Sequence, residues 1–215
     1  MAIITISRGS LSGGRALAEC LSSRLGYPNV GREVIQEAAE AMGASEEAFR
    51  GKYETTPGLW GRLTHAREKY VLAMQTSLAE WCTRGDLVYH GLSGQHLLKG
   101  LPGILRVRLI APLEMRVKAL LEAHPHMSVS QAEDFIRNVD QDRSRWVKVM
   151  HGADVSDASV YDLIINLQTH TIESACETIA TAAAQPRFQI TDEIEAEIFA
   201  FAAECRDRLS RVKGG

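Results

Sequence analysis

The chain of 215 residues has no apolar run long enough to cross a membrane, no signal-peptide layout, no internal repeat and no low-complexity tract. Its seven histidines show no H-x-x-x-H spacing, which predicts that there is no structural metal site. The cysteines are few, widely scattered and without C-x-x-C spacing: Cys20, Cys82, Cys176 and Cys205. This scatter predicts reduced thiols rather than a disulfide or zinc framework.

The chain also lacks a large excess of charge of either sign, with 24 Lys and Arg residues against 27 Asp and Glu residues. The net charge of −3 and the isoelectric point near 6.2 argue against nucleic acid as the main partner. With 45% hydrophobic residues, the chain is able to form a core, and it has the length of one domain or of one domain with an appendage. We predict a cytoplasmic protein with neither a nucleic-acid nor a membrane partner.

The most informative stretch is present near the start of the chain. An apolar segment from Ile3 to Ile6 precedes a glycine-rich turn, and helical spacing follows. The turn has the spacing of the phosphate-binding pattern G-x-x-x-x-G-K-[ST], with arginine for lysine and alanine for the hydroxyl residue. The predicted phosphate-binding residues are Gly9, Ser10, Leu11, Ser12, Gly13, Gly14, Arg15 and Ala16.

Such a turn binds phosphate through converging backbone N–H groups and the positive end of the following helix. Arg15 keeps a cation in the motif, and we expect nucleotide affinity to depend on it. Ala16 cannot ligate Mg²⁺, so phosphates, waters and another residue must hold that ion. A plain strand–turn–helix remains an alternative. The loop of short-chain dehydrogenases fits less well, because Arg15 replaces its last glycine and no Tyr-x-x-x-Lys follows.

Further apolar periodicity predicts an α/β fold. Strands are expected at residues 87–90, 104–110 and 161–167, and helices at residues 32–42, 59–82, 96–99, 131–150 and 172–184, with a short helix after Ser45. Strands separated by helices indicate crossovers and a parallel sheet. After Gln185-Pro186, a final helix is expected from Thr191 to about Val212.

The order of these segments resembles the cytidylate-kinase-like family of P-loop proteins, within the nucleoside monophosphate kinase group. The resemblance rests on "ITISRGSLSGGRALAECLSSRLGY", "REVIQEAAEAMG", "VYHGLSGQHLL", "GILRVRLIAPLEMRV" and "YDLIINL". It implies a three-layer fold with a mostly five-stranded parallel sheet in residues 1–185. It also implies ATP as donor, a helical insert for the nucleoside monophosphate at about 31–84 and a lid at about 138–151. Residues 186–215 form a helical extension.

Phosphoryl transfer needs positive charge around the phosphoryl group that is transferred. The resemblance assigns lid arginines to that role, and Arg143 and Arg145 are the candidates. Because they are two residues apart, they point to different sides of a regular helix. The plain alternative is a pair of surface ion pairs, Asp140–Arg143 and Asp142–Arg145. Arg32 and Arg67 are candidates for the acceptor phosphate, as are His90 and Gly91 at a strand end. The plain alternatives are surface charges for the two arginines and a buried, hydrogen-bonded side chain for His90.

The function expected from this reading is a nucleoside monophosphate kinase that uses ATP and Mg²⁺, with CMP or dCMP as acceptor. Two alternatives stay open: a catalytically weak nucleotide-binding regulator, and a phosphotransferase for another small metabolite. The C-terminal helix has an apolar stripe that includes Ile194, Ile198 and Phe201. It must pack on its own chain or across a homodimer.

Overall fold

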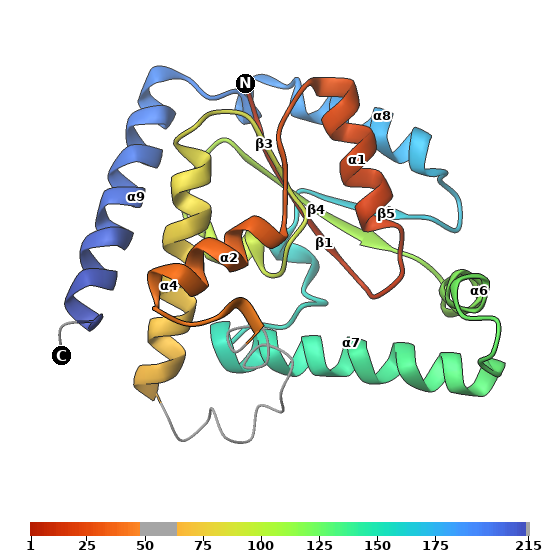
Figure 1. Cartoon of the computed structure of the whole chain (residues 1–215). Helices are drawn as coiled ribbons and strands as arrows, with labels where there is room; N and C mark the ends of the chain where they lie inside the picture. Colours follow the sequence, from red (N-terminus) through yellow and green to blue (C-terminus); the bar gives the residue numbers. More distant parts are fainter. Residues whose placement is uncertain (48–63, 214–215) are drawn as a thin grey trace.

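The computed structural model describes residues 1–47 and 64–213, and these form a three-layer α/β fold (Figure 1). The described residues contain one sheet of five parallel strands in the order β2-β3-β1-β4-β5. The strands are β1 (Ile3–Arg8), β2 (Asn29–Val30), β3 (Leu87–Tyr89), β4 (Ile104–Ile110) and β5 (Leu163–Asn166). The predicted five-stranded parallel sheet is confirmed.

Side chains of the central strand alternate between two cores, as the twofold period of a strand requires. Ile3 belongs to one buried cluster, whereas Ile4 and Ile6 belong to the other. Helices α1 (Gly14–Leu25) and α8 (Ile172–Ala183) cover the second cluster. Helices α2 (Arg32–Ala41), α4 (Thr64–Cys82) and α5 (Gly94–Leu97) cover the first. Because both faces of the sheet are covered, nearly every residue of β1 and β3 is buried.

Helices α6 (Leu113–Ala123) and α7 (Val129–His151) lie between β4 and β5 in the sequence. Ser128 and Gln131 form a reciprocal capping box at the start of α7, which fixes where this helix begins. Figure 1 shows α7 running across the side of the sheet on which the parallel strands end. Ligands of open parallel sheets bind at this side, so α7 stands over the region where the site is expected.

The final helix, α9 (Asp192–Lys213), packs on α4 of its own chain. Its buried residues Ile198, Cys205 and Leu209 belong to the same core cluster as the inner face of α4. Arg206 also forms an ion pair with Glu80 of α4, with Nε and Oε1 3.1 Å apart. The apolar stripe is therefore covered within one chain, although Phe199 remains 52% exposed. A homodimer through this helix stays a prediction.

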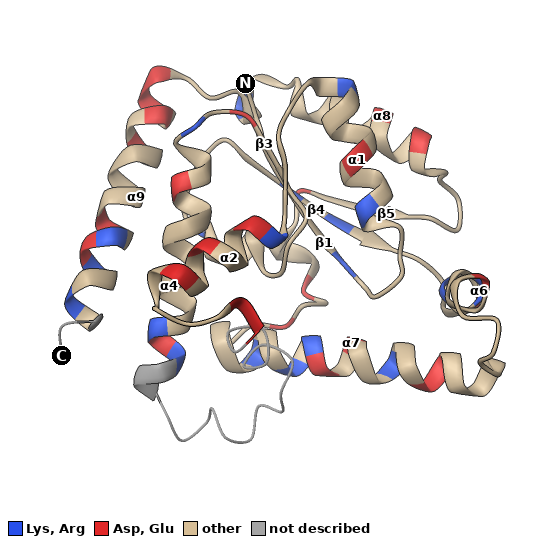
Figure 2. Ribbon diagram, in the orientation of Figure 1, with Lys and Arg blue, Asp and Glu red and all other residues tan. Residues whose placement is uncertain are grey.

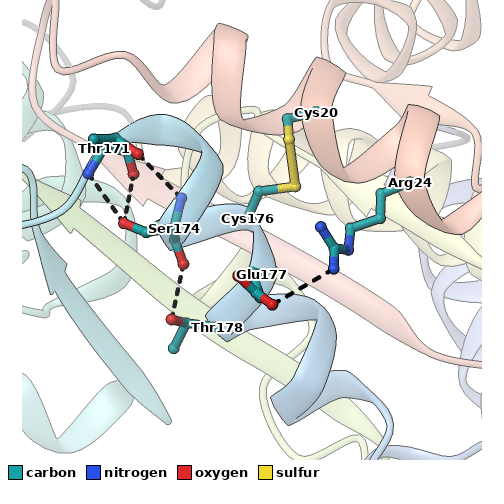
Figure 3. The surroundings of a disulfide bond; sticks show 7 residues. All are labelled: Cys20, Arg24, Thr171, Ser174, Cys176, Glu177 and Thr178. Atoms are coloured by element: carbon teal, nitrogen blue, oxygen red, sulfur yellow. Dashed lines mark hydrogen bonds and ion pairs between the residues drawn. A yellow bond between two sulfur atoms is a disulfide. The ribbon is translucent and has the colours of Figure 1, made fainter.

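Two of the four cysteines form a disulfide, so the prediction of four reduced thiols was wrong for this pair. Cys20 of α1 and Cys176 of α8 are bonded, with their Cα atoms 6.2 Å apart (Figure 3). The residues are separated by 156 positions, and only the packing of α1 on α8 brings them together. Cys82 and Cys205 are buried free thiols, and burial raises their pKa values to about 12 and about 11.

The observed boundaries differ modestly from the predicted ones. The short helix expected at 96–99 begins at Gly94, and the last strand is shorter than predicted. The predicted helix at 59–82 is described only from Thr64, and the short helix after Ser45 only at residues 46 and 47. The rest of both lies outside the described residues. In the part of the chain that the structure describes, no helix is long and apolar enough to cross a membrane.

Candidate functional site

The glycine-rich turn connects the end of β1 to the first turn of α1. Leu11 and Gly13 both adopt positive φ, at 56° and 73°, and Ser12 Oγ donates a hydrogen bond to the carbonyl of Gly9 at 2.9 Å. The first N–H groups of a helix have no partners within the helix, and they favour an anion at this end. The structure therefore places a tight turn and the start of α1 directly after β1, where the sequence predicts phosphate binding.

The outer side of the loop is held by α6 and α7. Asp140 Oδ1 accepts hydrogen bonds from the backbone N and the Oγ of Ser10, each at 2.8 Å. Arg116 of α6 pairs with the same carboxylate and donates to the Ser10 carbonyl at 3.2 Å. Burial alone would raise the pKa of Asp140, but its bonds to Ser10 and Arg116 outweigh burial and lower it. Sequence reasoning missed Arg116, and it treated Asp140 only as the surface partner of Arg143.

A cavity of about 450 Å³ lies beside the loop, at the carboxyl ends of the strands. Its walls come from β1, α1, α2, α5, α7 and the turn after β3, together with Val155 after α7. Figure 2 shows basic residues on several of these elements. The lining residues are Ser7, Arg8, Arg15, Gly31, Arg32, Ile35, His90, Gly91, Leu92, Ser93, Gln95, Arg143, Val147 and Val155. Five of the predicted site residues meet here: Arg15, Arg32, His90, Gly91 and Arg143.

The cavity contains four arginines, but they are not equivalent. The Arg15 side chain is 82% exposed, and its Nε lies 2.9 Å from Glu19 Oε1, one turn along α1. Arg32 forms a two-pronged pair with Glu46 at 2.6 and 2.9 Å. Arg8, the last residue of β1, was missed by sequence reasoning. The available signal was its position directly before the first glycine of the motif.

His90 lies against the start of α2. A Cβ atom at Gly31 would be 2.7 Å from the His90 ring, so only glycine allows this approach. Burial, followed by the positive charge of Arg8, lowers the pKa of His90 below its ordinary value. His90 is therefore a neutral imidazole near pH 7. A neutral ring can accept as well as donate a hydrogen bond.

A polar network centred on Tyr161 connects three of the lining residues, Ser7, Gln95 and Val155, although Tyr161 itself does not line the cavity. The Tyr161 hydroxyl accepts from Gln95 Nε2 at 3.2 Å and from Arg108 at 3.3 Å, and it donates to the Val155 carbonyl at 3.0 Å. It also lies 3.3 Å from Ser7 Oγ at the end of β1. Sequence reasoning missed Tyr161, because it placed this residue only at the start of a strand.

Of the predicted turn, only Arg15 lines the cavity, and residues 9–14 and 16 lie beside it. The other two predicted site residues outside the lining are Arg145 and Arg67. Arg145 pairs with Asp142 on the exposed face of α7 at 3.4 Å, as the surface alternative expected. The other expected pair, Asp140–Arg143, does not form, because Asp140 binds Arg116 and Ser10. Arg67 of α4 donates to the carbonyl of Val149 at 3.2 Å, which links α4 to the end of α7.

The chemistry of the donor set fits a phosphate chain. Several arginines and a helix start face one cavity, and the described lining includes no carboxylate. Ser93 Oγ is buried there without a hydrogen-bond partner among the described residues. The same lining fits a protein-held Mg²⁺ poorly, because that ion prefers carboxylate oxygens. Among the described residues, no group of three His, Cys, Asp or Glu side chains comes together.

The loop, the parallel sheet and the covering helices define a P-loop kinase fold. A crystal structure of a shikimate kinase from Bacteroides thetaiotaomicron has this fold, with a TM-score of 0.52 at 11% identity, covering 86% of this chain and 99% of that chain. An uncharacterized protein from Eubacterium ventriosum has a TM-score of 0.65 at 16% identity, covering 84% of this chain and 97% of that chain. Neither likeness carries more than the fold, because identity is low.

The chain belongs to the cytidylate kinase-like family, whose model matches residues 3–169. It is similar to the cytidylate kinase of Methanosarcina acetivorans, with 26% identity over 166 residues, 76% of this chain and 86% of the relative. It is also similar to the cytidylate kinase of Methanothermobacter thermautotrophicus, with 25% identity over 80% of this chain and 99% of the relative. The family match covers the loop, the sheet and the α6–α7 segment together.

Proposed function

We propose that this protein transfers the γ-phosphoryl group of ATP to a nucleoside monophosphate, with CMP or dCMP as the acceptor. Family and fold support a kinase that acts on a nucleotide or another small metabolite. The observation that carries the finer proposal is the single cavity that joins the loop at Arg15 to Arg32 and to the His90–Gly91 turn. Donor and acceptor phosphates fit into one basic space there.

In the proposed reaction, an oxygen of the acceptor phosphate attacks the γ-phosphorus of ATP. A new P–O bond forms, the bond to the β-phosphate oxygen breaks, and ADP leaves. No covalent intermediate with the protein is needed, so catalysis consists of positioning and charge stabilisation. When bound, Mg²⁺ would neutralise phosphate charge, with nucleotide oxygens and waters as its ligands.

The chain's own residues divide this work. Residues 9–16 hold the donor phosphates through backbone N–H groups at the start of α1. Arg143 brings positive charge from α7 to the phosphoryl group that is transferred. Arg145 lies on the outer face of the same proposed lid and adds positive charge there. Arg32, His90 and Gly91 bind the acceptor at the opposite wall. Arg67 supports the end of α7, and this end belongs to the proposed lid at 138–151.

A second candidate function is a catalytically weak nucleotide-binding regulator. It is favoured by Ala16, which cannot ligate Mg²⁺, and by Arg15, which pairs with Glu19. Phosphoryl transfer to another small metabolite is the third candidate, since a fold does not fix its substrate. The insert at about 31–84, the cytoplasmic location, the absence of a nucleic-acid or membrane partner and a homodimer through α9 remain predictions.

A coupled assay that detects ADP separates these candidates. Wild-type protein is mixed with Mg²⁺–ATP and, in separate reactions, with CMP, dCMP, UMP, AMP and GMP. The proposal expects turnover with CMP or dCMP to exceed that with the purine nucleotides. ATP binding by calorimetry without turnover of any acceptor would favour the regulator. The absence of both binding and turnover would contradict the nucleotide-binding function itself.

A further inference from the structure

Arg8 and Gly14 are packed against each other across the loop. A Cβ atom at Gly14 would lie 1.7 Å from Arg8 Cδ and 2.6 Å from Arg8 Nε. Gly14 is the first residue of α1, and its φ is not positive, so its backbone does not require glycine. The space taken by the Arg8 side chain is what requires it. The last residue of β1 therefore reaches over the start of α1, where a bound phosphate would meet the helix.

Arg15 occupies the lysine position of the phosphate-binding pattern and lines the cavity, but its Nε pairs with Glu19 on the surface of α1. Its side chain is 82% exposed and lies along α1 toward Glu19. A cation that is exposed and already paired contributes little to binding, because water and salt screen it. The expectation that affinity depends mainly on Arg15 is therefore revised here. Arg8 is only half-buried and lines the same cavity, and its charge lowers the pKa of His90 more than the charge of Arg15 does. At His90, the charge of Arg8 thus has a larger effect than the charge of Arg15.

We propose that Arg8 is the principal cation that binds the phosphate chain in the loop. In this proposal, glycine is needed at position 14 because it leaves space for the Arg8 side chain, and not because of its backbone conformation. The inference rests on one part of the proposed function, namely that the cavity binds a phosphate chain. It does not depend on phosphoryl transfer or on the identity of the acceptor. A guanidinium group reaches two phosphate oxygens at once with its planar fork, whereas lysine offers a point charge. Arg8 approaches from the strand side, so the usual lysine position on the helix is free to carry an exposed residue.

The test is calorimetric binding of inorganic tripolyphosphate, which carries the phosphate chain without a base or a reaction. Arg8→Met keeps much of the packed stem and removes the charge, and circular dichroism checks its fold. We expect its affinity to fall by about tenfold or more, because charge-assisted bonds to phosphate are lost. Arg8→Lys restores part of that loss. Arg15→Met lowers affinity by no more than about threefold, since its charge is screened.

Arg24→Met is the matched control, because Arg24 lies on α1 near Glu177 and outside the cavity lining (Figure 3). It should bind tripolyphosphate as the wild type does. Gly14→Ala tests whether the space at this position is needed. In the wild type it should lower the affinity for tripolyphosphate, because the added methyl group displaces the Arg8 side chain. In the Arg8→Ala variant it should lower the affinity little further, because that side chain is already absent.

Arg8→Met with wild-type affinity, or a larger loss in Arg15→Met than in Arg8→Met, would overturn the inference while leaving the proposed function intact. A wild-type protein that binds neither tripolyphosphate nor ATP would overturn both. Equal losses in Gly14→Ala with and without Arg8 would show that glycine is needed there for another reason, and would remove the structural support for Arg8.

Discussion

Asp140 of α7 accepts two hydrogen bonds from Ser10 of the predicted phosphate-binding loop, one from its backbone nitrogen and one from its hydroxyl, both at 2.8 Å. The proposed lid helix is thus attached to the loop that it covers. Arg116 completes the arrangement from α6 and is 14% exposed. Asp140 thereby fixes the outer half of the loop, while the helix start on its inner side stays open to the cavity.

Asp140→Asn should therefore destabilise the protein in a pH-dependent way. At pH 7 the variant leaves the Arg116 cation without its carboxylate, and we expect a loss of about 2 kcal/mol in the free energy of unfolding, because the pair is half-buried. Since the folded-state pKa of Asp140 is lowered, its contribution is present above about pH 4 and disappears as pH falls below that value. Urea unfolding at pH 7 and pH 3.5 measures this.

Asp142→Asn is the matched control for that experiment. It lies two residues further along α7, and its partner Arg145 is on the surface. Exposed pairs contribute only about 0–1 kcal/mol, so this variant should be nearly neutral at both pH values. Equal effects of the two substitutions would show that the Ser10–Asp140–Arg116 contact does not stabilise the fold.

His151 at the end of α7 should make the free energy of unfolding depend on pH between about pH 6.5 and about pH 4, above the range in which Asp140 acts. Burial, followed by the neighbouring His96, lowers the pKa of His151 to about 4, and the two rings are stacked with centroids 5.1 Å apart. The unfolded chain binds this proton near its ordinary pKa of about 6.5, so folding stability decreases as pH falls from there toward 4. His151→Gln should reduce that slope in urea unfolding. The exposed His126→Gln should keep it, and an unchanged slope in His151→Gln would contradict the assignment.

Local sequence patterns were sufficient for much of the fold. Apolar runs such as Ile3–Ile6 and the glycine spacing from Gly9 to Gly14 are local, and they located the strands and the loop correctly. Contacts between distant segments were not predictable in this way. Asp140 is 130 positions from Ser10, and Cys20 is 156 positions from Cys176. These contacts depend on how α7 and α8 pack, which residue spacing within one segment does not encode.

The candidate site shows the same division. The sequence located the segments that carry the arginines. Which of these arginines line the cavity depends on the direction of each side chain, which the sequence did not predict. Arg143 faces the cavity, and Arg145 faces Asp142. Arg15 satisfied the motif by position, but Glu19 one turn later offered its guanidinium a partner on the helix surface. The role of Arg8 depends on the close approach to Gly14, which appears only when strand and helix are placed together.

The two arginines of the proposed lid, Arg143 and Arg145, should differ in their effect on turnover. Arg143→Ala should lower kcat by about tenfold or more, because it removes charge from the cavity where phosphoryl transfer is proposed. Arg145→Ala should have a several-fold smaller effect, and it should change Tm by no more than about 2 °C, since its exposed pair with Asp142 contributes little. Arg143→Ala should also leave Tm nearly unchanged, because Arg143 lines the cavity and belongs to none of the buried clusters. Steady-state kinetics with melting curves measure both. A larger kcat loss in Arg145→Ala would place the lid charge on the opposite face.

The Cys20–Cys176 bond should contribute measurably to stability. It closes a long loop between α1 and α8, and such a bond is worth about 2–4 kcal/mol. Reductant should lower the denaturation midpoint of the wild type but not that of the Cys20→Ser/Cys176→Ser variant. Alkylation of denatured, unreduced protein followed by mass spectrometry should label only Cys82 and Cys205. Labelling of all four cysteines would show that the bond is absent in solution.

The most direct measurement of the central claim is phosphoryl transfer itself. Purified protein is incubated with CMP, Mg²⁺ and ATP labelled in the γ-phosphoryl group, and the products are separated by chromatography. The account predicts label in CDP, formed in equal amount with ADP, and a sharply reduced rate with Arg143→Ala. Release of the label only as inorganic phosphate, or ATP that binds and stays unreacted with every nucleoside monophosphate, would contradict it.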